Sequence, residues 1–393
     1  MGCCASSIPF SEPFGDHEVA FVEVRLTHAG SAVAPSCIIF YPRGEGGGPS
    51  KRQYFRQTII EHGIVSHSDL RYACCLGFRM QRPFPCHENA KVKMGINKNG
   101  LPLVIFSHGL FGCKEMYTSL ARNLASEGIV VICIEHEDGS ACYHVKKDGA
   151  EGRYVKPPDG IKYSNREEVR AFRLPFLEKR ASEVEAVLAA LVLGGVGDDV
   201  DSQDTALPPP PPGDTGVEET IESIRRAIDK GNIHLCGHSF GAASMMYATD
   251  RAERLIAGKA VIQSRILLDT WPYPLPASIE EGGTRALPSL FIASEEFMTG
   301  EEVELTKKLA KGSPNTQFCY LRGSVHQQFS DTPLWFPTSL GRRLKTTGSC
   351  DRLEAYQAIH VVTTAFIRLD QLREHSLICY GYSLVGGEEE EKK

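Results

Sequence analysis

The stretch that decides the fold is Asn232-Ile233-His234-Leu235-Cys236-Gly237-His238-Ser239-Phe240-Gly241. Its first half is a short apolar run typical of a buried strand, and its second half matches the G-x-S-x-G pattern of a nucleophile elbow. An elbow holds its serine on a sharp, strained turn between a strand and a helix, where side chains at the two glycine positions would clash. We therefore predict that Ser239 precedes the N-terminus of a helix, which favours developing negative charge.

A second segment, Ser107-His108-Gly109-Leu110-Phe111-Gly112, follows a short apolar strand predicted at Leu103–Ser107. In proteins built around a nucleophile elbow, the loop after this strand supplies one backbone N–H of an oxyanion hole. The residue after the nucleophile supplies the other. The pattern therefore predicts the backbone N–H groups of Leu110 and Phe240 as the donors. His108 itself is expected to be a structural, hydrogen-bonding residue.

The general base should follow the serine in the chain. Only three of the 13 histidines do so, namely His326, His360 and His375. The first lies in a loop after a predicted strand, whereas the second falls within a helical pattern and the third lies beyond the last predicted element. We expect His326 to be the base. For the acid, Asp269 and Glu295 both end predicted strands, and the pattern alone leaves that choice open.

Alternating strands and helices from about residue 101 predict an α/β protein, with a mostly parallel central sheet and helices on both faces. Together with the elbow, this pattern indicates an α/β-hydrolase fold. One domain is expected over residues 17–375, between an N-terminal segment (1–16) and a charged tail (376–393). Pro175 is expected to break or kink a long helical pattern. The expected elements are a hairpin over 17–41, strands near 103–107, 129–134, 232–236, 265–268, 289–293 and 318–321, helices near 117–127, 165–193, 218–230 and 353–372, and a proline-rich insertion at about 194–216.

Composition excludes several classes of function. A net charge of -6 over 393 residues provides no general basic field, so nucleic acid is not an expected partner. The 13 cysteines have neither paired spacing nor a CxxC pattern, so we expect free thiols. The run Glu135-His136-Glu137-Asp138 could suggest a metal site, but it lacks a second ligand cluster at suitable spacing. We expect no metal and no other cofactor.

Taken together, the motifs resemble those of the platelet-activating factor acetylhydrolases, over roughly residues 18–375. The resemblance implies that Asp269 is the acid, that Leu110 and Phe240 are the oxyanion donors, and that no metal is needed. It implies a calcium-independent phospholipase A2-type serine esterase, acting on the sn-2 acetyl or short or oxidised acyl group of glycerophospholipids. The matching stretches are Phe106-Ser107-His108-Gly109-Leu110, Leu124-Ala125-Ser126-Glu127-Gly128, Glu135-His136, Gly237-His238-Ser239-Phe240-Gly241, Leu268-Asp269-Thr270-Trp271 and Ser324-Val325-His326-Gln327.

Two alternatives remain open at this point. One is a general carboxylesterase or an esterase that acts on acylated proteins. The other is a non-catalytic membrane adaptor that uses Pro208 to Pro212 as a ligand. The first shares the catalytic residues Ser239, His326 and Asp269 with the preferred hypothesis, whereas the second needs none of them.

The N-terminal segment carries a separate signal. Met1-Gly2-Cys3-Cys4-Ala5-Ser6 fits the pattern for N-myristoylation, with glycine at position 2 and serine at position 6. Cys3 and Cys4 lie where palmitate is added once myristate has brought a chain to a membrane. A single myristoyl chain binds only marginally, and a second acyl chain makes the anchor stable. We expect myristate on Gly2, palmitate on the two cysteines, and a protein anchored peripherally to a membrane from the cytoplasm.

The change Gly2→Ala should therefore move the protein from membrane to cytosol, because alanine cannot accept myristate. Hydrolysis of a soluble ester should be unchanged. Each buried methylene contributes about 0.8 kcal/mol, so losing the acyl chains leaves only weak interfacial binding. The measurement is fractionation of cells that contain N-myristoyltransferase, with Cys3→Ser/Cys4→Ser as an intermediate case. Gly2→Ala fractionating like the wild type would contradict the anchor.

Overall fold

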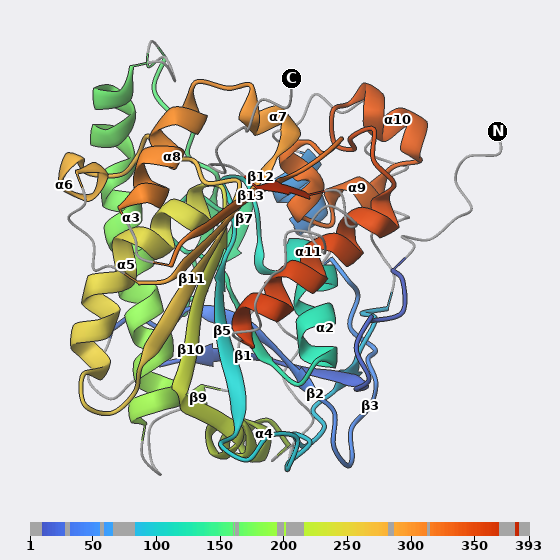
Figure 1. Ribbon diagram of the computed structural model, residues 1–393. Coiled ribbons are helices and arrows are strands. Elements are labelled where there is room, and N and C mark those ends of the chain that lie inside the picture. The colour runs from blue at the N-terminus through green and yellow to red at the C-terminus, as the bar shows by residue number, and fades with distance from the viewer. Residues whose placement is uncertain are drawn as a thin grey trace.

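The computed structural model describes residues 10–27, 32–55, 59–65, 83–159, 161, 165–194, 200–201, 216–281, 287–312, 315–368 and 382–384. Its centre is a large twisted sheet with helices packed on both faces (Figure 1). Residues 1–9 of the expected N-terminal segment (1–16), all of the expected tail (376–393) except 382–384, and most of the proline-rich insertion lie outside the described residues. None of the described helices is long and apolar enough to cross a bilayer.

The sheet has a parallel centre and antiparallel margins. Six parallel strands, β5, β6, β10, β11, β12 and β13, lie in the order β13-β12-β11-β10-β5-β6. The hairpin β1–β2 pairs antiparallel onto β6 and confirms the hairpin expected over 17–41. The strand bounds are β1 Val19–Leu26, β2 Ser36–Pro42, β3 Gly48–Pro49, β4 His87–Glu88, β5 Leu101–Ser107, β6 Val130–Ile134, β9 Val200–Asp201, β10 Ile228–His238, β11 Ile262–Leu268, β12 Ser289–Ser294, β13 Gln317–Leu321 and β14 Tyr382–Leu384, with a separate pair β7 Tyr143–Val145 and β8 Glu151–Arg153.

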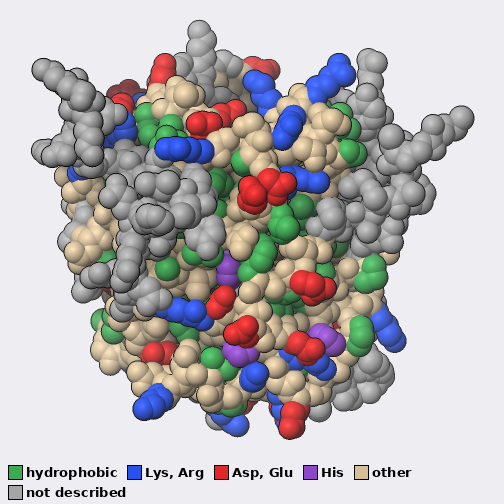
Figure 2. Space-filling model, turned by 45° about the vertical axis from the view of Figure 1, so that its right-hand side comes forward, with side chains coloured by type: hydrophobic (Ala, Val, Ile, Leu, Met, Phe, Trp, Pro, Cys, Tyr) green, Lys and Arg blue, Asp and Glu red, His purple; other side chains and the backbone are tan. Residues whose placement is uncertain are grey.

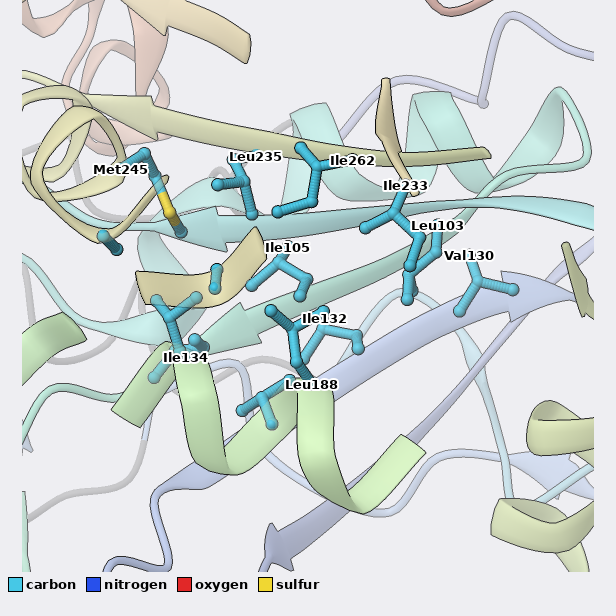
Figure 3. Packing of buried hydrophobic residues seen from close by; sticks show 14 of the residues in the cluster. Leu103, Ile105, Val130, Ile132, Ile134, Leu188, Ile233, Leu235, Met245 and Ile262 are labelled. Carbon is cyan, nitrogen blue, oxygen red and sulfur yellow. The ribbon is translucent and has the colours of Figure 1, made fainter. Parts of the chain in front are cut away.

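Alternation along the central strands divides the core into two layers. On β5, Leu103 and Ile105 belong to one buried cluster, while Val104 and Phe106 belong to the other. Side chains alternate between the two faces of a strand, so each central strand contributes side chains to both layers of the core. Figure 3 shows the first cluster, where Leu103 lies near Ile233 of β10 and Val130 of β6, and Ile132 of β6 lies between Ile105 and Leu188 of the helix α3. This two-sided burial explains why the strands are almost wholly apolar.

Helices α3, α4, α5 and α8 bury apolar residues in the first cluster, and α2 and α11 bury theirs in the second (Figure 1). Asn165 caps α3 by accepting from the Glu168 N–H, and the helix runs through Pro175. Of the two outcomes expected at Pro175, the break does not occur: the 23-residue helix packs on the sheet and tolerates the hydrogen bond that proline cannot donate. Its bounds and those of the other α-helices are α2 Thr118–Ser126, α3 Arg166–Leu188, α4 Gly216–Ala227, α5 Phe240–Ile256, α6 Ala277–Glu280, α7 Glu295–Met298, α8 Glu302–Lys311, α9 Thr332–Trp335, α10 Thr338–Arg343 and α11 Arg352–Ile367.

The order of the strands decides where a site can form. The chain passes from β5 to β6 on one side and returns to β10 on the other, so the connections diverge between β5 and β10. In open α/β sheets a crevice forms outside the carboxyl ends of the strands at such a switch point. The loops after these two strands carry Leu110 and Ser239, so the topology brings the two motifs side by side (Figure 1).

A fully buried ion pair lies beneath this crevice. Arg180 of α3 donates to the Asp138 carboxylate (3.0 Å), to the Ser107 hydroxyl (3.1 Å) and to the His108 carbonyl (2.6 Å). Neither side chain of the Arg180–Asp138 pair is exposed. Burial raises the pKa of Asp138, but the Arg180 charge and the hydrogen bonds from Ser140 together outweigh burial and hold that pKa below its usual value. On the surface, by contrast, acidic and basic side chains are interspersed over the described part of the face in Figure 2.

The change Asp138→Asn should lower the free energy of unfolding by about 3–5 kcal/mol, because it leaves a buried guanidinium uncompensated. A matched control is Glu222→Gln, which removes the exposed partner of Arg226. Exposed pairs contribute about 0–1 kcal/mol. The measurement is urea unfolding of both variants at neutral pH. Equal small losses would show that Arg180 finds sufficient compensation elsewhere.

Candidate active site

The elbow owes its shape to two close backbone contacts. A Cβ atom at Gly241 would lie 2.0 Å from the carbonyl oxygen of Ser107, and one at Gly237 would lie 2.4 Å from the Gly241 backbone. Glycine is therefore required at both positions. Ser239 between them adopts φ 57° and ψ -119°, a strained conformation for a residue with a side chain. Its N–H donates to the Leu268 carbonyl (2.9 Å), which ties the turn to β11.

The loop after β5 is held so that one peptide faces the serine. The Gly109 carbonyl accepts from His108 Nδ1 (2.8 Å) and from the Gly112 N–H (3.2 Å). A trans peptide is planar, so the Leu110 N–H points opposite to that carbonyl. Among the described residues nothing accepts a hydrogen bond from the backbone N–H of Leu110 or Phe240. The sequence-predicted donors are thus both free, and the second is the first N–H of α5.

The structure brings the predicted serine, histidine and aspartate together in one hydrogen-bonded line. Ser239 Oγ lies 3.0 Å from His326 Nε2, and His326 Nδ1 lies 2.7 Å from Asp269 Oδ2. Asp269 is buried, while 35% of the His326 side chain is exposed. The three residues follow β10, β11 and β13, so the carboxyl ends of three parallel strands on one side of the sheet supply them, with β12 between β11 and β13.

The structure separates the two candidate acids. Asp269 Oδ1 accepts from the Ser294 N–H (2.8 Å), and Oδ2 accepts from the Ser294 hydroxyl (2.7 Å) as well as from the imidazole. Glu295 instead accepts from the Gly323 N–H (3.0 Å) and does not reach the ring. Its neighbour Glu296 accepts from the His326 backbone N–H (3.0 Å). Both glutamates therefore hold the histidine loop, and only Asp269 orients the imidazole.

Electrostatics gives the histidines of the site different protonation. Burial lowers the pKa of His326, but the hydrogen bond and charge of Asp269 outweigh burial and raise that pKa above its usual value. Burial and the nearby His326 hold the pKa of His238 well below its usual value. Burial also lowers the pKa of His108 to about 3. Only His326 is therefore set to exchange a proton near neutral pH.

The described residues contain two groups whose ligand atoms lie close enough to hold a metal ion. In the first, His238, Asp269 and His326 already spend their ring nitrogens and carboxylate oxygens on hydrogen bonds. In the second, burial raises the pKa of the Cys113 thiol well above its usual value, which disfavours the thiolate a metal would need. Glu115 of that group pairs with Arg52 (2.6 Å). Neither set of donors is suited to a metal.

A cavity of about 440 Å³ opens over the serine. Its wall combines Leu110, Ser239 and His326 with apolar and aromatic side chains, and Lys345 adds a single cation to it. This size is typical of pockets for small ligands. The other apolar and aromatic residues of the wall are Ile64, Phe111, Met116, Tyr117, Trp335, Phe336 and Leu344.

Several residues that shape the site carry no signal in a single sequence. Arg180 reaches the loop after β5 from a helix some 70 residues further along the chain. His136, which was considered above as a metal ligand, bonds instead to Ser107 (2.7 Å) and to the buried Glu183 (2.6 Å). His360 bonds to Glu127 (3.0 Å), away from the serine, and His375 lies outside the described residues. The predicted lipidation residues Gly2, Cys3 and Cys4 also lie outside them.

A mostly parallel sheet with a nucleophile elbow, free backbone donors and a serine-histidine-aspartate line defines the chain as an α/β-hydrolase. The profile of the family described as "Platelet-activating factor acetylhydrolase, isoform II" matches residues 71–377. The chain belongs to that family. The matched region contains every candidate site residue except the three at the N-terminus.

Similar proteins agree with this assignment. The chain is 28% identical over 295 residues to the platelet-activating factor acetylhydrolase of Canis lupus familiaris, and 26% identical over 294 residues to that of Gallus gallus. Each alignment covers 72% of this chain, and the chain spans 60% and 64% of those two relatives. A putative phospholipase A2 of Schizosaccharomyces pombe is 25% identical over 311 residues, 71% of this chain and 69% of that protein. A solved ferulic acid esterase from Streptomyces cinnamoneus shares the fold, with a TM-score of 0.63 over 96% of this chain and 99% of that one, at 16% identity.

The electrostatics predicts how His326 titrates. Asp269→Asn should lower the pKa of His326, because it removes the charge that raises that pKa and leaves the effect of burial. Glu295→Gln is the matched control and should leave the midpoint unchanged, because Glu295 bonds to Gly323 and not to the ring. NMR titration of labelled histidine measures both midpoints, with His326→Gln to assign the signal. A larger shift in the Glu295→Gln variant would contradict the assignment of the acid.

Proposed function

We propose that this protein is a serine esterase of the calcium-independent phospholipase A2 type. Its substrate would be platelet-activating factor or a related glycerophospholipid that carries an acetyl, short or oxidised acyl group at sn-2. The observation that carries the proposal is the line Ser239–His326–Asp269 at the wall of an apolar cavity. Membership of the family, and the names of its relatives, support the choice of substrate class.

The reaction would proceed through an acyl-enzyme. His326 Nε2 takes the proton of Ser239 Oγ as that oxygen attacks the ester carbonyl, and Asp269 stabilises the imidazolium that forms. The negative charge on the carbonyl oxygen is held by the N–H groups of Leu110 and Phe240. When the tetrahedral intermediate collapses, His326 returns the proton to the leaving glycerol oxygen. Water then attacks the acyl-serine with His326 as base, which releases the acid and restores Ser239.

The pKa of His326 gives this reaction its pH dependence. The ring must be neutral to accept the serine proton, and Asp269 holds its pKa above the usual 6.5. Turnover should therefore rise with pH through a midpoint above that value and fall as the ring becomes protonated.

The cavity supports a lipid ester with a short acyl chain. Its wall is mainly apolar, so the acyl group and nearby glycerol carbons would lose their hydration on binding. Lys345 supplies a positive charge suited to the phosphate of the head group. A limited volume of about 440 Å³ favours acetyl and other short acyl groups over long chains. We also propose that acyl groups on Gly2, Cys3 and Cys4 hold the enzyme at the membrane where such lipids lie.

The change Ser239→Ala should lower the hydrolysis of a soluble p-nitrophenyl ester by several orders of magnitude, because no other described side chain takes the position of the nucleophile. Labelling by a fluorophosphonate should disappear in the same variant. Circular dichroism and thermal unfolding establish that the variant is folded. More than a few per cent of wild-type activity in folded Ser239→Ala protein would overturn the proposed nucleophile. Loss of wild-type activity in excess EDTA that calcium restores would overturn the calcium-independent type.

Turnover measured across sn-2 chain lengths separates the phospholipase from the runner-up esterases. We expect rates to fall as the chain grows from acetyl to long saturated acyl groups, because the cavity is limited in size. Under the alternative of a general carboxylesterase or acyl-protein esterase, p-nitrophenyl esters or acylated peptides would be cleaved while every phospholipid of the series stays intact. That outcome would leave the serine mechanism standing and overturn the substrate class.

A further inference from the structure

We infer that Tyr117 and His238 form a positioning pair that fixes the oxyanion loop relative to the catalytic His326, and so determines the rate of the chemical step. The inference rests on the proposed esterase function and adds two residues to its machinery. Neither residue belongs to the line Ser239–His326–Asp269. Both are buried, with exposed fractions of 3% for Tyr117 and 2% for His238.

Tyr117, at one end of the pair, holds the oxyanion loop, which is the segment after β5 that carries the Leu110 N–H. The Gly109 N–H donates to the Tyr117 hydroxyl oxygen at 3.1 Å. The carbonyl of the same residue is held from the other side by His108 and Gly112. With both of its backbone polar groups fixed, Gly109 leaves the following peptide, which carries the Leu110 N–H, little freedom to rotate. Loop and serine are also in contact, since a Cβ atom at Gly109 would lie 3.2 Å from Ser239 Cβ.

The other end of the pair holds the base. His238 Nε2 lies 3.0 Å from the His326 carbonyl oxygen, and His238 Nδ1 lies 2.9 Å from the Tyr117 hydroxyl. The two imidazole rings lie against each other, with centroids 4.6 Å apart and planes inclined by 37°. His238 is also the residue that precedes Ser239 in the elbow. His238 thus contacts the base through its side chain, while its own backbone leads directly into Ser239.

The donors and acceptors in this series of hydrogen bonds allow one arrangement of protons. A carbonyl oxygen only accepts, so His238 must donate from Nε2 to the His326 carbonyl. In the neutral ring Nδ1 is then an acceptor, and it takes the Tyr117 hydroxyl hydrogen. The Tyr117 oxygen in turn accepts from Gly109. The burial that lowers the pKa of His238 keeps the ring neutral, as this arrangement requires.

The hydrogen bonds that join Gly109, Tyr117, His238 and His326 should affect the rate of the reaction and not the affinity for substrate. The oxyanion exists only in the transition state and the tetrahedral intermediates, so an error in the position of its donor chiefly lowers kcat. The same holds for the approach of His326 Nε2 to Ser239 Oγ. A pair that acted only on folding would change thermal stability and leave kcat of the folded protein intact.

The test uses the full chain, a soluble p-nitrophenyl acetate substrate, three single variants and one double variant. Tyr117→Phe removes the hydroxyl. His238→Gln keeps an amide donor near the Nε2 position and loses the acceptor at Nδ1, whereas His238→Asn keeps an acceptor near Nδ1 and loses the donor. We expect Tyr117→Phe to lower kcat about tenfold with KM changed less than twofold. His238→Asn should lower kcat at least as much, and Tyr117→Phe/His238→Gln should lose no more than the worse single change, because both break one bond.

Two controls match these changes away from the site. Tyr41→Phe removes a buried hydroxyl that donates to the Ala90 carbonyl at 2.8 Å. His234→Asn changes a buried histidine of the same strand, whose nitrogens lie 2.7 Å from Ser264 Oγ and from Asn232 Oδ1. Both controls should unfold at lower temperature yet keep kcat within twofold of the wild type.

The inference is overturned if Tyr117→Phe and His238→Asn behave like these controls, with lower melting temperatures and wild-type kcat. It is also overturned if their loss falls on KM alone. Failure of the proposed esterase function would look different, because wild-type protein would then be no more active than Ser239→Ala.

Discussion

The close approach of two strand ends is the constraint on which the rest of this structure depends. The carbonyl of Ser107, at the end of β5, lies where a Cβ atom of Gly241 would be, so β10 and the first turn of α5 touch the end of β5 directly. This contact exists because the chain diverges on either side of β5 and β10, at the centre of the sheet. It places Ser239, the proposed nucleophile, beside the loop that carries the Leu110 N–H, the proposed oxyanion donor. The strained backbone of Ser239 is stabilised by the packing of both strands, whose core positions are fully buried.

Around this contact, polar groups form hydrogen bonds that fix each loop of the site on the side away from the cavity. Arg180 and Asp138 hold the backbone of His108, and Ser294 holds Asp269 through both of its carboxylate oxygens. Glu296 holds the backbone of His326. By contrast, the backbone N–H groups of Leu110 and Phe240 have no acceptor among the described residues, and His326 Nε2 lies 3.0 Å from Ser239 Oγ. A rigid support with a few free donors is the arrangement that electrostatic stabilisation of an oxyanion requires.

Much of this could be predicted from the sequence, and the limits have physical causes. The apolar strands and the elbow glycines gave the fold, because burial on both faces and a backbone clash leave local marks in sequence. The positions of Ser239, His326, Leu110 and Phe240 followed from chain order and strand ends, but the pattern could not choose between Asp269 and Glu295. Both end parallel strands, and only the three-dimensional path of the histidine loop separates them. Arg180, Tyr117 and His238 were missed as supports because their partners are distant in sequence. The helix α3 is not broken at Pro175, because packing outweighs local propensity.

A crystal structure of the protein after reaction with a fluorophosphonate tests the central claim most directly. The account predicts a phosphorus atom bonded to Ser239 Oγ, with its phosphoryl oxygen about 2.7–3.1 Å from the backbone nitrogens of both Leu110 and Phe240. His326 Nε2 should remain next to Ser239 Oγ, and His326 Nδ1 should still form its hydrogen bond with the Asp269 carboxylate. An adduct on another residue would contradict the account. So would a phosphoryl oxygen on Ser239 that points away from both nitrogens, because the geometry described above would then not be the one that the reaction uses.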